Sequence, residues 1–263
     1  MHITSRDNSL LRQVRAVRDG KIEKQIFVEG LRLCEEALRS QLEIEAVVVS
    51  EELLRKERAA GVIQELSQAS KRFASVGEKL LESVSYTKTP QGIIVLAVRP
   101  EASESRLGSQ LGSKPLLVVL HQINNPVNVG AILRTSEAAG AAGVIATRNT
   151  TDPFSPKSLR GAMGSAFRLP IWSGPSYVEM IDWCRQCGIA TICSDVDATT
   201  SHTEIDWTGP SALILGPEST GLTPEELELA DHRVSIPMKG MAESLNVAVA
   251  AGVLLFESAR QRR

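Results

Sequence analysis

Five consecutive aliphatic residues at positions 116–120, Leu-Leu-Val-Val-Leu, constrain the fold more than any other feature of the chain. A strand that is apolar at every position is typical of a parallel sheet whose two faces are both covered by helices. Later short apolar runs alternate with segments of helical spacing, and they lie at 143–146, 189–193, 212–215 and 234–236. Residues 115–263 are therefore predicted to form an α/β domain around a mostly parallel sheet.

The helices expected in this region span about 129–139, 177–187, 223–229 and 244–257. Thr223 followed by Pro224 suits the start of the third of these helices, because a hydroxyl cap and a proline at the first position both favour a helix start.

Residues 1–100 also alternate between helical and strand-like patterns, which predicts a smaller α/β domain. Apolar residues recur at helical spacing in 10–17 and 31–38, and a longer helical stretch covers 52–68. Strand-like runs lie at 44–49, 73–76 and 92–98. Residues 101–114 are rich in Ser, Gly and charged side chains, so we predict a linker there, between domains at 1–100 and 115–263.

The composition is that of a soluble globular protein, with 43% apolar and 23% charged residues. No apolar run reaches the roughly 18 residues of a membrane helix, and the first residues lack the apolar core of a secretory signal. Four cysteines make no disulfide framework in a chain of 263 residues, so we expect a cytoplasmic protein.

The charge is nearly balanced, with 29 Lys and Arg against 31 Asp and Glu. A nucleic acid would therefore have to bind a local basic patch. Arg12, Arg15 and Arg18 share one arc of the first predicted helix. They indicate either a phosphate-binding edge or an ordinary solvated helix face.

Ligands of parallel α/β sheets bind at the carboxyl ends of the strands, so the loops after 116–120, 212–215 and 234–236 are the places to look. The first loop crowds Asn124, Asn125 and Asn128 around one turn, and Arg134 follows about one helical turn later. This pattern fits a capped helix with a surface arginine, and it fits a polar site equally well.

The second loop contains Gly216 and Gly221, which permit a close approach of the backbone to a ligand, and Glu218 places a carboxylate beside them. A glycine-rich turn before a capped helix is the alternative. The third loop enters its helix through Ser244, and Asn246 is the odd polar residue of that helix start. If buried, Asn246 needs hydrogen-bond partners, so it is either a structural clamp or a ligand contact.

Motifs for other chemistries are missing or weak. The chain has neither a G-x-G-x-x-G nor a P-loop sequence, which removes the usual support for a dinucleotide or nucleoside-triphosphate site. Cys184 and Cys187 form a lone C-x-x-C pair, whereas a structural zinc site would want a second pair, so we expect no metal. His121 ends the first buried strand, where it either faces the site or supports the structure.

Taken together, the three loops resemble the three motifs of the SpoU/TrmH family of RNA ribose 2′-O-methyltransferases, within the SPOUT superfamily. The matching segments are 124–134, 213–222 and 236–247. The earlier region, including Phe27-Val-Glu-Gly30 and Thr89-Pro-Gln-Gly92, resembles the ribosomal-protein-L30-like substrate-binding domain of members that modify ribosomal RNA.

The resemblance implies a catalytic domain with a trefoil knot, S-adenosylmethionine as cofactor, and a homodimer with its active site at the interface. It implies cofactor contacts at Gly216, Glu218, Gly221, Ile236, Met238, Leu245 and Asn246. It implies catalytic roles for Asn128, Arg134, Glu218, Ser244 and Asn246. Arg134 would also contact RNA across the dimer interface, and the amino-terminal domain, with Arg12, Arg15 and Arg18, would choose the RNA.

We therefore expect an S-adenosylmethionine-dependent RNA 2′-O-ribose methyltransferase that acts on 23S ribosomal RNA, with a guanosine as one candidate target. Two alternatives stay open at this point. One is the same reaction on transfer RNA, and the other is a relative that binds RNA and has lost catalysis.

Overall fold

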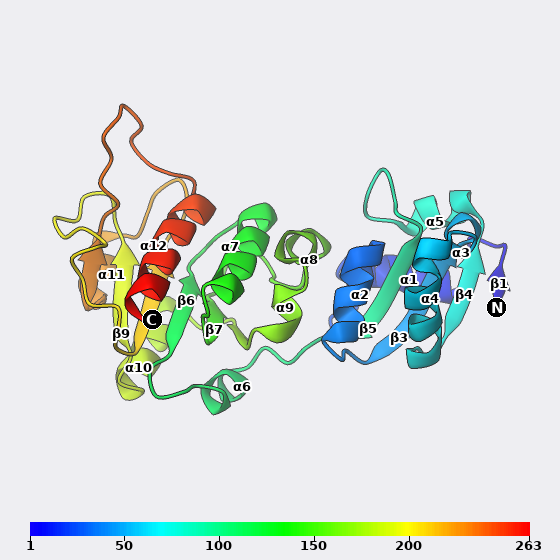
Figure 1. Ribbon diagram of the computed structural model, residues 1–263, viewed down its shortest axis with the longest axis horizontal. Coiled ribbons are helices and arrows are strands. Elements are labelled where there is room, and N and C mark those ends of the chain that lie inside the picture. The colour runs from blue at the N-terminus through cyan, green and yellow to red at the C-terminus, as the bar shows by residue number, and fades with distance from the viewer. The chain divides into compact units, whose positions relative to one another are not determined.

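The computed structural model describes all residues, 1–263. The chain forms two compact units, which are described separately. The first unit contains Met1–Pro100 and Phe154–Arg168, and the second contains Glu101–Pro153 and Leu169–Arg263 (Figure 1).

The second unit is built on a six-stranded sheet in the order β11-β9-β10-β6-β7-β8. All its neighbouring strands pair in parallel, as the sequence predicted. The strands are β6 (Leu116–Leu120), β7 (Gly143–Ala146), β8 (Ile171–Ser173), β9 (Ala190–Ser194), β10 (Ser211–Leu215) and β11 (His232–Val234). Every residue of β6 and β10 is buried, which explains why these runs are apolar throughout.

Helices cover both faces of this sheet, namely α6 (Glu104–Ser109), α7 (Pro126–Ala138), α10 (Tyr177–Gln186), α11 (Pro224–Leu229) and α12 (Val247–Gln261). Leu107 of α6, Met180 and Ile181 of α10, and Leu117 and Val119 of β6 belong to one apolar cluster, so α6 and α10 pack on one face. Helices α7 and α12 pack against each other over the opposite face (Figure 1).

Three predicted boundaries in this unit were wrong by a few residues, and capping explains two of them. Helix α7 begins at Pro126 instead of about 129, because the Asn125 side chain accepts a hydrogen bond from the Val127 amide. Helix α12 begins at Val247 instead of 244, because Asn246 is its cap. The last strand is His232–Val234, and the chain beyond it makes only an isolated bridge from Ser235 to Ser201.

The first unit contains a five-stranded sheet in the order β1-β4-β3-β5-β2, in which β5 pairs antiparallel with both β2 and β3. Its strands are β1 (His2–Ile3), β2 (Gln25–Glu29), β3 (Ile44–Ser50), β4 (Phe73–Val76) and β5 (Ile93–Val98). Its helices are α1 (Ser9–Arg18), α2 (Leu31–Arg39), α3 (Glu51–Leu54), α4 (Glu57–Ala69), α5 (Glu78–Val84), α8 (Pro156–Ala162) and α9 (Ser165–Arg168). The small α/β fold and most of its elements agree with the sequence patterns, although the stretch 52–68 is divided into α3 and α4.

Residues 101–114 hold a short helix, α6, which the low apolar content of this stretch did not indicate. The Ser103 hydroxyl caps α6 by accepting a hydrogen bond from the Arg106 amide. The Leu107 side chain is fully buried in the second unit. Leu107, with Leu111 packed against the same apolar cluster, docks this segment.

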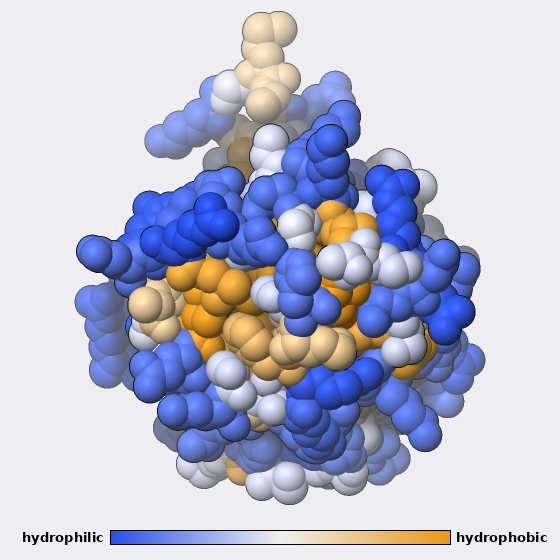
Figure 2. All heavy atoms as spheres, turned by 90° about the vertical axis from the view of Figure 1, so that its right-hand side faces the viewer, coloured by the Kyte–Doolittle hydropathy of each residue, from blue (hydrophilic) through white to orange (hydrophobic).

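The surface of the first unit has an apolar area within a mostly polar surround on the side seen in Figure 2. The large apolar residues exposed in this unit are Met1, Leu54 and Tyr86. None of the helices of the chain is both long and apolar enough to span a membrane.

Candidate functional site

The carboxyl ends of β6 and β10 lie side by side and carry the first two candidate loops. Leu120 and Leu215 are register partners in the parallel pair of these strands. The backbone amide of His121, the first residue after β6, donates a 2.9 Å hydrogen bond to the Leu215 carbonyl. The first and second loops therefore begin at neighbouring positions that are joined by a hydrogen bond.

Asn128 lies in the first turn of α7 and is 6% exposed. Its Oδ1 accepts a 3.3 Å hydrogen bond from Nδ2 of Asn246. The orientation of both amides follows from the cap of α12, since Asn246 Oδ1 accepts from the Ala248 amide at 2.9 Å and leaves Nδ2 as the donor. The buried Nδ2 of Asn128 has no hydrogen-bond partner.

An unpaired buried donor is costly and calls for a partner from outside the chain, and the Ser173 hydroxyl is the other buried polar atom without one. Asn128 and Asn246 are 118 residues apart in the chain, and they bring the first and third loops together. The sequence left two roles open for Asn246, a clamp or a ligand contact. It caps α12 and donates to Asn128, which fits the clamp, and its contact with a ligand stays a prediction.

The second loop runs from Gly216 to Leu222, between β10 and α11. A Cβ atom at Gly216 would lie 3.0 Å from Cγ of Leu222, so a larger residue would require Leu222 to move by a few tenths of an ångström. Gly221 has φ of +65°, a conformation that strongly favours glycine. Glu218 is exposed, and its carboxylate makes no ion pair.

The third loop carries apolar side chains that are open to solvent. Met238 is 38% exposed and Leu245 is 37% exposed, while Ile236 is half-buried. Ser244 is also exposed. The third loop can therefore present both apolar side chains and backbone amide and carbonyl groups to a ligand.

Arg134 stands apart from the two asparagines. Its side chain is exposed and makes neither a hydrogen bond nor an ion pair. It is two helical turns beyond Val127, which is 48% exposed, so both residues lie on the same outward face of α7. Asn128 points in a different direction on that helix.

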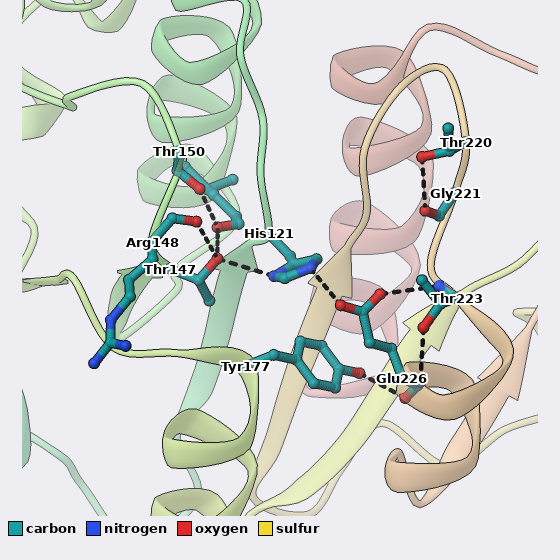
Figure 3. Close-up of polar contacts among 10 residues, drawn as sticks. His121, Thr147, Arg148, Thr150, Tyr177, Thr220, Gly221, Thr223 and Glu226 are labelled. Carbon is teal, nitrogen blue, oxygen red and sulfur yellow. Dashed lines mark hydrogen bonds and ion pairs between the residues drawn. The ribbon is translucent and has the colours of Figure 1, made fainter.

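A buried polar network that the loop patterns did not indicate lies directly beside the second loop (Figure 3). His121 Nε2 is 2.9 Å from Glu226 Oε1, and His121 Nδ1 is 2.9 Å from the Thr147 hydroxyl. Burial lowers the pKa of His121 despite the opposing effect of the Glu226 carboxylate. The sequence signal for Glu226 was its place three residues after Thr223, where the two form a capping box.

The three arginines of α1 differ in their contacts. Arg12 is exposed and makes no hydrogen bond or ion pair. Arg15 donates to the Arg6 carbonyl, and Arg18 donates to Asp19 and to the Ser85 carbonyl. The Arg18 guanidinium holds the pKa of Asp19 below its usual value. Of the three, only Arg12 therefore has all its donors available.

The four cysteines are free thiols, of which Cys187 is exposed and Cys34, Cys184 and Cys193 are buried. Burial raises the pKa of Cys184 to about 12 and that of Cys193 to about 11, so both are held as neutral thiols. No group of His, Cys, Asp or Glu side chains is arranged to hold a metal ion.

Comparisons with known proteins cover both units. Residues 115–256 match the SpoU rRNA Methylase family, and residues 10–95 match the MRM3-like substrate binding domain. An uncharacterized tRNA/rRNA methyltransferase of Synechocystis is 32% identical over 99% of this chain and 94% of its own length. The 23S rRNA (guanosine(2553)-2′-O)-methyltransferase of Bacillus subtilis is 31% identical over 88% of this chain and 86% of its own.

The crystal structure of an AdoMet-bound rRNA methyltransferase from Sinorhizobium meliloti has a TM-score of 0.86 at 28% identity, and covers 99% of this chain and 97% of the other. The family match spans more than half of the chain and includes all three loops described above. The chain therefore belongs to the SpoU rRNA methylase family.

Proposed function

We propose that this protein transfers a methyl group from S-adenosylmethionine to a ribose 2′-hydroxyl of 23S ribosomal RNA. The single observation that carries this proposal is the buried, unpaired Nδ2 donor of Asn128, held at the meeting point of the first and third loops. The Bacillus subtilis relative carries out 2′-O-methylation of a guanosine in 23S rRNA by its name, and the Sinorhizobium structure contains AdoMet.

The second and third loops fit S-adenosylmethionine. Gly216 carries no side chain beside Leu222, and Gly221 permits the left-handed turn of the loop, so the backbone amide and carbonyl groups of the second loop can approach an adenosine. Ile236, Met238 and Leu245 provide apolar contacts for the adenine ring, and Glu218 supplies a carboxylate for a hydroxyl or ammonium group. When bound, the cofactor supplies a methyl group activated by its sulfonium charge.

The residues of the chain align this methyl group with the RNA hydroxyl. Asn246 fixes the Asn128 amide, whose free Nδ2 donates to an oxygen of the bound substrate or cofactor. Ser244 precedes this pair in the same loop, where its hydroxyl contacts the ribose or cofactor. Alignment of this kind would be the main requirement, because loss of the methyl group would convert the sulfonium of the cofactor into a neutral thioether, and the hydroxyl would release its proton.

Arg134 binds the phosphate next to the target ribose and stabilises charge that develops on the attacking oxygen. It does not serve as the base, because a guanidinium is effectively never deprotonated in a protein. The free guanidinium of Arg134 and its outward position on α7 support this role. The proton passes to another acceptor in the assembled complex.

The protein acts as a homodimer in which Arg134 of one protomer reaches the site of the other. Val249, Val253 and Phe256 of α12 are exposed at 53%, 37% and 54%, and they recur at helical spacing on one face. Val127 of the neighbouring α7 is exposed as well. An apolar face on two packed helices is typical of a buried subunit contact.

The first unit selects the RNA, in keeping with its match to a substrate-binding domain. Arg12, with Arg15 and Arg18 in the last turn of α1, contacts RNA phosphates. The balanced charge of the chain favours recognition of a folded RNA shape over general adhesion. The reduced state of the four cysteines fits a cytoplasmic enzyme.

The deep trefoil knot of the SPOUT superfamily is part of this proposal. The match of residues 115–256 to the SpoU rRNA Methylase family supports it.

The test is transfer of label from methyl-labelled S-adenosylmethionine to unmodified 23S, 16S and transfer RNA in separate reactions. We expect label in 23S RNA only. Label in transfer RNA only would show that the substrate is transfer RNA instead of 23S RNA, while the proposed reaction would still hold. A protein that binds 23S RNA but neither binds the cofactor nor transfers label would be a catalytically inactive relative, and the proposal would fall.

A further inference from the structure

The second loop is held at both of its ends by one residue, His121. At the start of the loop, the His121 backbone amide donates to the carbonyl of Leu215, the last residue of β10, at 2.9 Å. At the end of the loop, His121 Nε2 lies 2.9 Å from Oε1 of Glu226, in the first turn of α11. We call these two contacts of His121, one at each end of the loop, the bridge. Figure 3 shows its side-chain contact with Glu226.

The direction of the side-chain bond is fixed by its partner. The Glu226 carboxylate can only accept hydrogen bonds, so Nε2 of His121 carries the proton and donates it. Burial lowers the pKa of His121, which keeps the imidazole neutral, and its unprotonated Nδ1 accepts from the Thr147 hydroxyl at 2.9 Å. All polar atoms of this ring are thus satisfied in one tautomer.

Neighbouring contacts hold the bridge rigid. The His121 and Tyr177 rings meet edge to face with centroids 4.8 Å apart, and the Tyr177 hydroxyl donates to the Glu226 backbone carbonyl at 2.9 Å. The other carboxylate oxygen of Glu226, Oε2, accepts from the Thr223 amide at 2.9 Å. The side chains of His121, which follows β6, and of Tyr177 on α10 thereby fix Glu226 of α11, just beyond the end of the loop.

The loop itself has few anchors of its own. Glu218, Ser219 and Thr220 are exposed, and Leu222 is its one buried side chain. Within it, the Gly221 amide donates to the Pro217 carbonyl at 3.0 Å. If a loop binds a ligand through its backbone and is flexible before binding, the conformational entropy lost on ordering weakens the ligand affinity. Such a loop therefore binds more tightly when it is ordered beforehand. The contacts of His121 with Leu215 and Glu226 order the loop in this way.

We infer that His121 and Glu226 are positioning residues that hold residues 216–222 in the shape that binds S-adenosylmethionine. This inference rests on the proposed function, which places the cofactor at that loop. Neither residue needs to touch the cofactor, so the effect of losing the bridge falls on cofactor affinity and not on the methyl-transfer step.

The test compares two amides at position 121. In His121→Gln the longer amide reaches as far as Nε2 and keeps a donor for Glu226, whereas the amide of His121→Asn reaches only as far as Nδ1. We expect His121→Asn to raise the Kd of S-adenosylmethionine about tenfold by calorimetry, which equals about 1.4 kcal/mol. His121→Gln should stay within about twofold of the unmodified protein. Glu225→Gln, on the exposed neighbour of Glu226, is the matched control.

Two further readouts separate positioning from general damage. His121→Asn should raise the KM for S-adenosylmethionine and leave kcat and the KM for RNA nearly unchanged. Without any cofactor, it should also speed hydrogen exchange of the peptide containing residues 216–223, while exchange in the β6 and β10 strands stays slow.

Equal cofactor affinity and equal loop exchange in the Asn and Gln variants would overturn the inference, as would a fall in kcat with unchanged KM. If the unmodified protein did not bind S-adenosylmethionine, the proposed function would fail, and the exchange experiment would still decide whether His121 orders the loop.

Discussion

At the scale of single residues, the candidate site depends on amide and imidazole groups whose orientations are fixed by their neighbours. Asn128 is the clearest case, because the cap of α12 orients Asn246, Asn246 orients Asn128, and one buried donor is left over. The sequence singled out both Asn128 and Asn246. It could not show that they touch, because the two residues are 118 positions apart and meet only after the whole domain has folded.

Asn128→Asp tests the unpaired donor. The carboxylate oxygen can still accept from Asn246, but the second oxygen replaces the Nδ2 donor with an acceptor. We expect kcat for methyl transfer to fall by about 10²-fold, in line with the removal of one oriented donor from an active site. The measurement is single-turnover transfer with saturating RNA. Full activity in this variant would show that the unpaired donor has no part in the reaction.

Arg134→Lys tests the planar guanidinium. Lysine keeps the positive charge but loses the fork of donors that binds phosphate in a bidentate way. We expect a fall of at least about tenfold in kcat/KM for RNA, with unchanged affinity for S-adenosylmethionine. Near-normal transfer with unchanged RNA affinity would mean that the planar geometry of the guanidinium is unimportant.

His121 gives the stability of the protein a specific pH dependence. Its pKa is lowered in the folded state by burial, while Glu226 on α11 is the charged group that faces it and Tyr177 on α10 is the other titratable one. Below about pH 6.5 the unfolded chain binds more protons at this residue than the folded one, so the free energy of unfolding falls there. It should be restored as the pH rises above that value.

Urea unfolding of the unmodified protein and of His121→Gln at pH 7.5 and pH 5.5 measures this effect. The unmodified protein should lose more stability between the two pH values than the variant, because glutamine does not titrate. Parallel losses in both proteins would contradict the burial of a neutral imidazole.

At the scale of elements, periodicity located most strands and helices, and caps decided where they begin. The continuous apolar run at 116–120 predicted β6 correctly because a strand buried on both faces cannot tolerate polar side chains. The start of α12 was misplaced, because Ser244 and Asn246 are both acceptable caps and the contact with Asn128 favours Asn246. Helix α6 was missed because Leu107 is its only buried residue.

A buried carboxylate, Glu29, holds the segment after α5 in the first unit and can be tested by mutation. Glu29, at the end of β2, is 7% exposed and accepts hydrogen bonds from the amides of Tyr86 and Thr87 and from the Thr87 hydroxyl. Glu29→Ala would leave these donors without a partner. We expect a loss of about 2–4 kcal/mol of stability by chemical denaturation, as for other broken buried networks. A loss below about 0.5 kcal/mol would mean that water replaces the carboxylate freely.

At the scale of the whole molecule, the proposed mechanism requires two protomers. Phe256→Asp places a charge in the exposed apolar face of α12, whereas Val196→Asp places one at an equally apolar and 66% exposed position elsewhere. Sedimentation should show a dimer for the unmodified protein and for Val196→Asp, and a monomer for Phe256→Asp. The monomer should also lose methyl transfer, because Arg134 could no longer reach a second site. A Phe256→Asp dimer would exclude this face as the interface.

The global arrangement is the level at which the sequence is least informative. Alternating strands and helices predicted two α/β regions, but the assignment of residues 154–168 to the first unit depends on contacts between distant segments. The knot stays a prediction of the family resemblance, since local patterns carry no information on how a chain threads, and threading is rare in proteins generally.

The most direct test of the proposed reaction is to digest 23S RNA after methyl transfer and to identify the labelled nucleoside by mass spectrometry. We expect a single 2′-O-methylnucleoside with an unmodified base, formed by the unmodified protein and strongly reduced in Asn128→Asp. A methyl group on a base would contradict the ribose assignment and with it the proposed roles of Asn128 and Arg134.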